Sequence, residues 1–210
     1  MIAAIAKAAI PEPYRIFGLQ LLPFSLGRYR RMQRFGCAFV AEEESTATFQ
    51  DLVLGLAVCS QRCQEFDEWL QSKSCAKDLA RWGRRIRREI AAEEHFNLYG
   101  KYELFKRYLD EASDMPKYWD ESETQPISGA HWSHSVEVAL RGELGYTAEE
   151  INENPLQKSL ADYFKWAESQ GLVRLMTPEE IAYVESGQAQ MTVTPAPKAS
   201  ATQEEVFNGS

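Results

Sequence analysis

The sequence predicts a mainly α-helical protein, and three observations carry this prediction. Hydrophobic residues make up 44% of the 210-residue chain, which is enough for a substantial core. Apolar side chains recur at three- and four-residue spacing through most of the chain before residue 185. Helix-capping residues precede several of these stretches. We therefore expect an irregular multi-helix bundle over residues 1–187, with lobes at 15–113 and 130–187, and a flexible tail at 188–210.

The first lobe is expected to begin with a short basic helix. Ser25 is placed to cap a helix from about Leu26 to Phe35, and Gly36 offers the left-handed conformation at which helices commonly end. The apolar run Cys37–Val40 that follows has the length of a strand. We therefore assign these residues to a helix followed by a short strand.

The next helix is predicted to be the most buried one. Thr48 with Asp51 resembles a capping box, with Asp in place of the usual Glu or Gln. Helical spacing then connects the apolar residues Phe49, Leu52, Val53, Leu56, Ala57 and Cys63, while Leu54 and Val58 occupy the other face. A helix that is apolar nearly all round is expected to be enclosed by other elements. A second helical piece follows, with Phe66, Trp69 and Leu70.

Two amphipathic helices are expected before the middle of the chain. Ser74 precedes the first, whose apolar stripe is Leu79, Trp82, Ile86 and Ile90, while Arg81, Arg84, Arg85 and Arg88 project elsewhere. The second has the stripe Tyr102, Phe105, Leu109 and Ala112 and must end near Pro116, because that ring cannot continue a helix. The stretch from Ser113 to Ala130 is predicted to be a loop.

The second lobe carries several marked helix starts. One helix contains Trp132, Val136, Ala139 and Leu140 and ends near Gly145. Another has its apolar face at Leu156, Leu160, Tyr163, Phe164 and Ala167 and is closed by Gly171. Starts are predicted at Thr147 with Glu150, at Asn154 before Pro155, and at Thr177 before Pro178 with Glu180.

Charge is distributed unevenly along the chain, whose net charge is −8. Residues 1–40 carry six basic side chains against one acid, whereas residues 121–210 carry fourteen acids against five bases. Such polarity suits contact between complementary ends of neighbouring subunits, and thus a homo-oligomer, better than it suits a polyanion.

The sequence also indicates a cytosolic protein without a membrane anchor. Lys7 interrupts the apolar segment Met1–Ile10, which no basic region precedes, so a secretory signal fits poorly. No run approaches the roughly 18 apolar residues of a membrane span. We interpret the four cysteines, which are Cys37, Cys59, Cys63 and Cys75, as reduced thiols, because a chain with this much core needs no disulfides.

No catalytic, metal or cofactor site is predicted. His131 and His134 have a spacing that metals use, but no further ligand is supplied nearby, and histidines at a helix start or facing solvent are the commoner case. Cys59 and Cys63 are also four apart, but their helix is apolar, and buried thiols behave as small hydrophobes. Neither a nucleophile elbow nor a phosphate-binding glycine loop is present, and His95 lacks the second histidine of a zinc protease helix.

The arginine run is the best case for nucleic-acid binding. Five arginines stand within the eight positions from Arg81 to Arg88 and could neutralise several phosphates. The same helix continues into Glu89, Glu93 and Glu94, and the chain as a whole is acidic. A solvated face or an ion-paired subunit contact is the commoner explanation for such a run. A DNA-binding regulator is therefore kept as the third functional hypothesis.

Four short motifs resemble those of small proteins encoded among the tail genes of long-tailed bacteriophages. They are Leu22–Gly27 near the start, Asp51–Leu52 leading to Val58–Ser60, Pro116–Trp119, and Asn154–Leu156 leading to Asp162–Phe164. The resemblance touches most of residues 15–180 and extends to length and helical content. Its motifs are structural, and they carry over no catalytic position.

The resemblance implies a non-enzymatic tail-assembly chaperone or a related factor of virion morphogenesis. Such a protein would act in the host cytoplasm and keep the tape-measure protein soluble while tail tube subunits polymerise around it. Partner contact is expected at Trp69, Trp82, Arg84, Arg85, Arg88 and Trp132. The chief alternative is a structural component, such as a minor head or tail protein, that stays in the virion.

Overall fold

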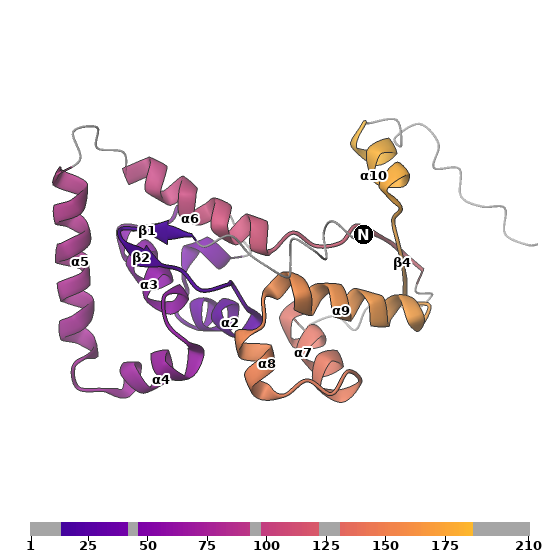
Figure 1. Ribbon diagram of the computed structural model, residues 1–210, viewed down its shortest axis with the longest axis horizontal. Helices are drawn as coiled ribbons and strands as arrows, with labels where there is room; N and C mark the ends of the chain where they lie inside the picture. Colours follow the sequence, from indigo (N-terminus) through magenta and orange to yellow (C-terminus); the bar gives the residue numbers. More distant parts are fainter. Residues whose placement is uncertain (1–13, 42–45, 93–97, 122–130, 187–210) are drawn as a thin grey trace, which may run out of the picture. The chain divides into compact units, whose positions relative to one another are not determined.

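The protein is mainly α-helical, as predicted, in the computed structural model (Figure 1). The residues that the structure describes are 14–41, 46–92, 98–121 and 131–186. They contain nine α-helices and four short strands. None of these helices is both long and apolar enough to span a membrane. The predicted tail at 188–210 lies outside the described residues.

The chain divides into two units, Met1–Leu175 and Met176–Ser210. The helices of the first unit are α2 Leu26–Arg34, the 3-10 helix η1 Ala38–Val40, α3 Phe49–Cys59, α4 Cys63–Gln71, α5 Cys75–Ala92, α6 Leu98–Ala112, α7 Trp132–Gly142, α8 Ala148–Glu153 and α9 Leu156–Ser169. Its strands are β1 Arg15–Ile16, β2 Leu19–Gln20, β3 Tyr118–Asp120 and β4 Val173–Leu175, of which β1 pairs antiparallel with β2 and β3 with β4. The described helix of the second unit is α10, Pro178–Glu185.

Four of the predicted helix starts are confirmed by their hydrogen bonds. The side chain of Ser25 accepts from the backbone N–H of Arg28 at the start of α2. Reciprocal capping boxes open three other helices, which are α3 with Thr48 and Asp51, α8 with Thr147 and Glu150, and α10 with Thr177 and Glu180. Each box satisfies backbone N–H groups that the first helical turn leaves without a partner.

Two element assignments in the first half of the chain were wrong. The predicted strand Cys37–Val40 is instead the 3-10 helix η1, because an apolar run of this length does not distinguish a strand from a helical turn. Cys63 does not belong to the helix that contains Phe49. It begins α4, after α3 has ended at Cys59.

Two further assignments were wrong in the second half. The predicted loop 113–130 contains the strand β3, whose partner β4 is distant in sequence and could not be recognised locally. Asn154 does not cap α9. The helix begins one residue later, with Pro155 at its N-cap position, and Asn154 instead ends α8.

One hydrophobic core runs through the first unit and joins residues from both expected lobes. Its buried members include Phe24, Leu26, Met32, Leu52, Leu56, Phe66, Phe105, Val136, Leu140, Leu156, Leu160 and Phe164. Helix α2 packs against both α3 and α8, α7 packs against α8 and α9, and α5 contacts α3 and α4 (Figure 1). As predicted, α3 is the most completely enclosed helix, with seven of its eleven residues buried.

Arg28 is fully buried in the middle of this packing and connects three parts of the chain. Its guanidinium donates to the carbonyl oxygen of Pro23 at 3.1 Å and to that of Gln61, between α3 and α4, at 3.0 Å. It also forms an ion pair of 2.7 Å with Glu153 at the end of α8. The other carboxylate oxygen of Glu153 accepts from the backbone N–H of Cys63 at 2.6 Å. Arg28 and Glu153 therefore hold α2, α4 and α8 together.

Removing the Arg28 side chain should strongly destabilise the protein. Arg28→Ala leaves the carboxylate of Glu153 without its cation and two backbone carbonyls without their donor, so we expect a loss of about 3 kcal/mol in the free energy of unfolding. Chemical denaturation followed by circular dichroism measures this loss. The exposed Arg34 on the same helix is the control, and Arg34→Ala should stay within about 0.5 kcal/mol of the wild type. Equal losses in the two variants would contradict this account.

Close approach of α2 and α8 depends on a glycine. A Cβ atom at Gly27 would lie 2.7 Å from the backbone Cα and 2.8 Å from the carbonyl oxygen of Asn152. The hydroxyl of Ser25 donates to that same carbonyl oxygen. The side-chain oxygen Oδ1 of Asn152, at 2.6 Å, could turn aside, but these two backbone atoms cannot move without shifting the helix. Only glycine fits this contact.

Gly27→Ala should therefore cost about 1–3 kcal/mol of stability, because α8 must shift away from α2. A matched control is Gly142→Ala in α7, where a Cβ atom would meet no neighbour within 4 Å. This change should be neutral or stabilise by up to about 1 kcal/mol, since alanine favours a helix more than glycine does. Thermal unfolding of both variants compares the two sites, and an unchanged midpoint for Gly27→Ala would refute the close packing.

Candidate functional site

Two of the predicted partner-binding tryptophans meet where α4 and α5 join. The indole rings of Trp69 and Trp82 stack, with centroids 6.2 Å apart and planes inclined by 21°. Phe66, which is buried, packs beneath Trp69 with a centroid distance of 5.6 Å. Both tryptophans are half-buried, so each anchors the corner and leaves part of its ring at the surface. We call Trp69 and Trp82 the tryptophan corner.

The corner is held by a polar network at the start of α5. The indole N–H of Trp69 donates to the carboxylate of Asp78 at 3.4 Å, and Arg81 pairs with the other oxygen of that carboxylate at 2.8 Å. Hydrogen bonds from the side chains of Ser74 and Trp69, and the nearby cations, keep the pKa of the Asp78 carboxyl below its ordinary value. The carboxylate is therefore charged at neutral pH and fixes α5 to α4.

Of the three predicted partner-binding arginines, Arg84 and Arg88 project from α5 on the side away from the core, whereas Arg85 reaches the turn that contains Gly18. Arg84, Arg85 and Arg88 are exposed, whereas the buried residues of this helix are Cys75, Ile86 and Ile90. Arg85 pairs with Glu89 at 2.8 Å. Figure 1 shows α5 at one edge of the first unit. The tryptophan corner and these arginines thus belong to the surface around α5, with Trp82 on the inward side of that helix and Arg84 and Arg88 on its outward side.

Trp132 does not belong to that surface. It is the first residue of α7 and packs against Tyr29 of α2, with a centroid distance of 4.9 Å. Helices α5 and α7 lie on opposite sides of α2 in Figure 1. The sequence could not separate Trp132 from the other two tryptophans, because all three stand on the apolar face of a helix and only the packing decides which faces meet.

Both candidate histidines lie at the start of α7. His131 is the N-cap residue, and its ring nitrogen Nδ1 accepts from the backbone N–H of Ser133 at 3.2 Å. Its other ring nitrogen lies 3.3 Å from the hydroxyl of Tyr29. His134 is exposed. Within the described ranges, no three side chains of metal-binding type come together.

All four cysteines are free and buried. The prediction that Cys59 and Cys63 lie on one helix was wrong, because Cys59 ends α3 and Cys63 begins α4. Burial raises the pKa of the Cys59 thiol to about 12, and it raises the pKa of Cys37 and of Cys63 to about 11. These thiols are therefore protonated at neutral pH and are weak nucleophiles.

Burial of the thiols predicts slow thiol chemistry in the folded protein. At pH 8 a disulfide reagent such as dithionitrobenzoate should modify Cys37, Cys59 and Cys63 at least about tenfold more slowly than it does after unfolding, because the attacking species is the thiolate. Cys75, which is the least buried of the four, should react first, and a Cys75→Ser variant identifies its contribution. Rapid modification of three thiols in the native state of that variant would contradict the burial.

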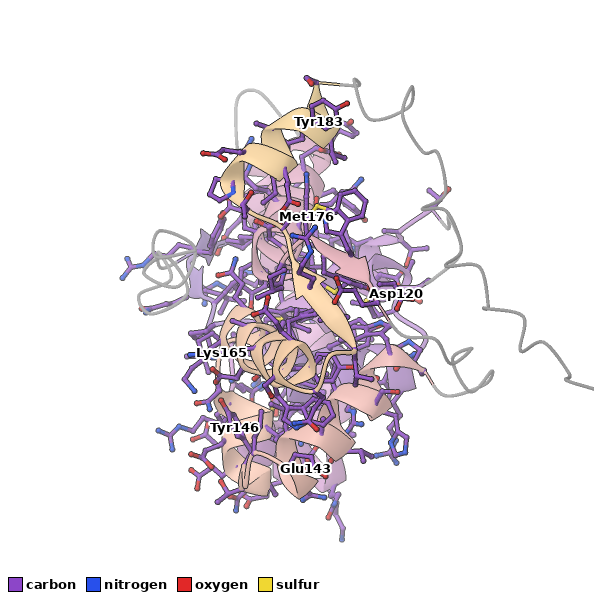
Figure 2. All side chains as sticks on the ribbon, turned by 90° about the vertical axis from the view of Figure 1, so that its right-hand side faces the viewer. Asp120, Glu143, Tyr146, Lys165, Met176 and Tyr183 are labelled. Carbon is purple, nitrogen blue, oxygen red and sulfur yellow. The ribbon has the colours of Figure 1, made fainter. Side chains whose placement is uncertain are left out.

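Another polar cluster, which the sequence analysis did not identify, joins α9 to the turn before α8. The ammonium of Lys158 donates to the hydroxyl of Tyr146 at 2.7 Å and to the carboxylate of Asp162 at 3.2 Å, and Tyr146 also donates to Asp162. Figure 2 shows Tyr146 below Lys165, at the end of the molecule that also holds Glu143. Burial first, and then the Asp162 carboxylate, raise the pKa of the Tyr146 hydroxyl. The hydroxyl is thus not activated as a base, and the cluster serves to connect α9 to the turn before α8.

The four-residue spacing of Lys158 and Asp162 was the available signal for this cluster, but Tyr146 comes from another segment.

Comparisons of the chain with protein-family models, with curated proteins and with solved structures gave no match. The candidate site that emerges from the geometry is therefore the surface formed by the tryptophan corner and α5.

Proposed function

We propose that this chain is a non-enzymatic assembly factor for the tail of a long-tailed bacteriophage. In this role it binds the tape-measure protein or a tail tube protein in the host cytoplasm and keeps it soluble until the tail is built. The motifs described above support the proposal through their resemblance to proteins of phage tail gene clusters.

The observation that carries the proposal is the incomplete burial of α5. Only three of its eighteen residues are buried, although helices in proteins owe most of their stability to the packing of an amphipathic face. The helix is held on one side, by Ile86 and Ile90 in the core and by the tryptophan corner. Its other side, together with the exposed parts of the two tryptophans, is open to a partner. A helical partner can pack along such a face.

A factor of this kind should rescue its partner in cells. We expect that co-expression of the chain with the tape-measure gene of the same phage raises the soluble fraction of the tape-measure protein several-fold, because the apolar stripe of that long helical protein becomes covered. Soluble and pelleted fractions compared by electrophoresis give the measurement. Gly142→Ala, which should leave the fold intact, should rescue equally well.

The composition of purified phage particles separates the proposal from its chief alternative. A chaperone should be missing from the finished particle, whereas a minor head or tail protein should be found there by mass spectrometry. If the chain fails to rescue the tape-measure protein and is found in the particle, the assembly-factor hypothesis is wrong and the chain is a structural component.

The exposed arginines of α5 favour a second candidate, a DNA-binding regulator. Such a protein should bind duplex DNA with an affinity that falls steeply with salt, since each phosphate contact releases a counterion. Changing Arg84 and Arg88 to Glu should abolish that binding. An absence of DNA binding at low salt would remove this candidate.

A further inference from the structure

The exposed cations of α5 form a single line along the helix. Lys77, Arg81, Arg84 and Arg88 follow one another at spacings of four, three and four residues, and all four are exposed. Side chains at these spacings share one face of an α-helix. The line spans about 16 Å at the usual rise per residue. We call these four residues the basic stripe.

The basic stripe lies opposite the face that α5 turns to the core. The inward face carries Cys75, Leu79, Trp82, Ile86 and Ile90. At 3.6 residues per turn, the mean direction of the stripe is about 190° from the mean direction of these residues. The stripe therefore points away from the packed helices.

The two acids of α5 stand at the margin of the inward face, not within the stripe. Asp78 bonds to Trp69 and Arg81, and Glu89 pairs with Arg85. The rest of the outward surface of α5 is made of alanines and of Arg87, which lies over the ring of Phe49 at 5.0 Å. Within the described part of the chain, Arg84 and Arg88 have no ion pair.

The alternation of four- and three-residue steps along the stripe suits a partner that is itself an α-helix. Two helices that lie along one another bring side chains together at this spacing. A helix whose carboxylates repeat in the same way can place one carboxylate opposite each cation of the stripe. The alanines beside the stripe leave room for its backbone to approach. A planar guanidinium also suits the bidentate recognition of a carboxylate.

We propose that the basic stripe of α5 binds an acidic amphipathic α-helix of another protein, with Asp or Glu at alternating spacings of three and four residues. This inference rests on the proposed function, for which it specifies the chemistry of the partner.

The chain itself does not supply this helix within the residues that the structure describes. None of its described helices carries three acids at alternating three- and four-residue spacing; the closest, α4 and α8, offer pairs such as Glu65 with Glu68 and Glu149 with Glu153. Glu153 is already bound to Arg28. Charge complementarity therefore favours a different protein over a second copy.

Nucleic acid is the other polyanion to consider. The net charge of −8 opposes a long phosphate backbone, which extends past the stripe to the rest of an acidic chain. A single acidic helix avoids this repulsion, because it covers the stripe alone. The observations thus favour a carboxylate partner over a phosphate partner.

A designed peptide tests the proposal on the full chain. The probe is a labelled helical peptide of three heptads with Glu at alternating three- and four-residue spacing, and its isomer with the same composition but with Glu spread around the helix is the control. Fluorescence anisotropy should show binding of the first peptide at least about tenfold tighter than binding of the second, and this binding should weaken as salt is added.

Charge reversal locates the binding on the protein. The variant Arg84→Glu/Arg88→Glu should raise the Kd of the peptide at least about tenfold. The variant Arg107→Glu/Lys165→Glu makes the same change in net charge at two exposed positions on α6 and α9, and it should leave the Kd within about twofold. Lys165 lies on the face seen in Figure 2. Circular dichroism verifies that both variants are folded.

Four results would overturn the proposal. Three of them are equal binding of the two peptides, equal effects of the two charge reversals, and tighter binding of a duplex DNA than of the Glu peptide at the same salt concentration. Self-association of the chain that the Arg84→Glu/Arg88→Glu variant abolishes would assign the stripe to a second copy instead and overturn it as well.

The rescue assay keeps this inference separate from the proposed function. If the wild-type chain rescues the tape-measure protein and Arg84→Glu/Arg88→Glu rescues it equally, the assembly role stands and the stripe is not its docking surface. If the wild-type chain fails to rescue it, the assembly role fails regardless of the peptide result.

Discussion

The first unit depends on one buried cation, the guanidinium of Arg28. A charge that is removed from water is costly unless its hydrogen bonds and its counter-charge are supplied by the protein. Here two backbone carbonyls and the carboxylate of Glu153 supply them. Because these partners come from different parts of the chain, α2, α8 and the junction of α3 with α4 must all be in place together. One guanidinium N–H group, at Nε, has no partner among the described atoms.

The same ion pair influences the candidate binding surface at a distance. Glu153 accepts a hydrogen bond from the first backbone N–H of α4. This is the N-terminal end of the helix, where a negative charge is favourable. Helix α4 carries Trp69, which stacks on Trp82 and so orients α5. The position of the exposed arginines therefore follows from a chain of contacts that begins in the core. A packed core thus positions a helix that is only partly covered.

The uneven distribution of charge along the chain is used largely within the molecule. Arg28 pairs with Glu153, Arg30 with Glu137, and Arg31 with Asp67. Two of these acids come from the acidic second half of the sequence. The basic start of the chain, which suggested contact between neighbouring subunits, thus meets its complement inside one chain. On α5, in contrast, the arginines outnumber their local acids and project outwards.

The sequence by itself determined the elements that depend on neighbouring residues. Capping boxes such as Thr48 with Asp51 act within one turn, and the apolar stripe of α5 follows from helical periodicity, so the helical class and most helix starts could be predicted. Only the tertiary structure decided which distant groups meet. It paired β3 with β4, buried Arg28 against Glu153, and joined Trp69 with Trp82 while turning Trp132 towards Tyr29. The physical reason is that caps and periodicity act within a few residues, whereas burial and ion pairing depend on how whole faces pack together.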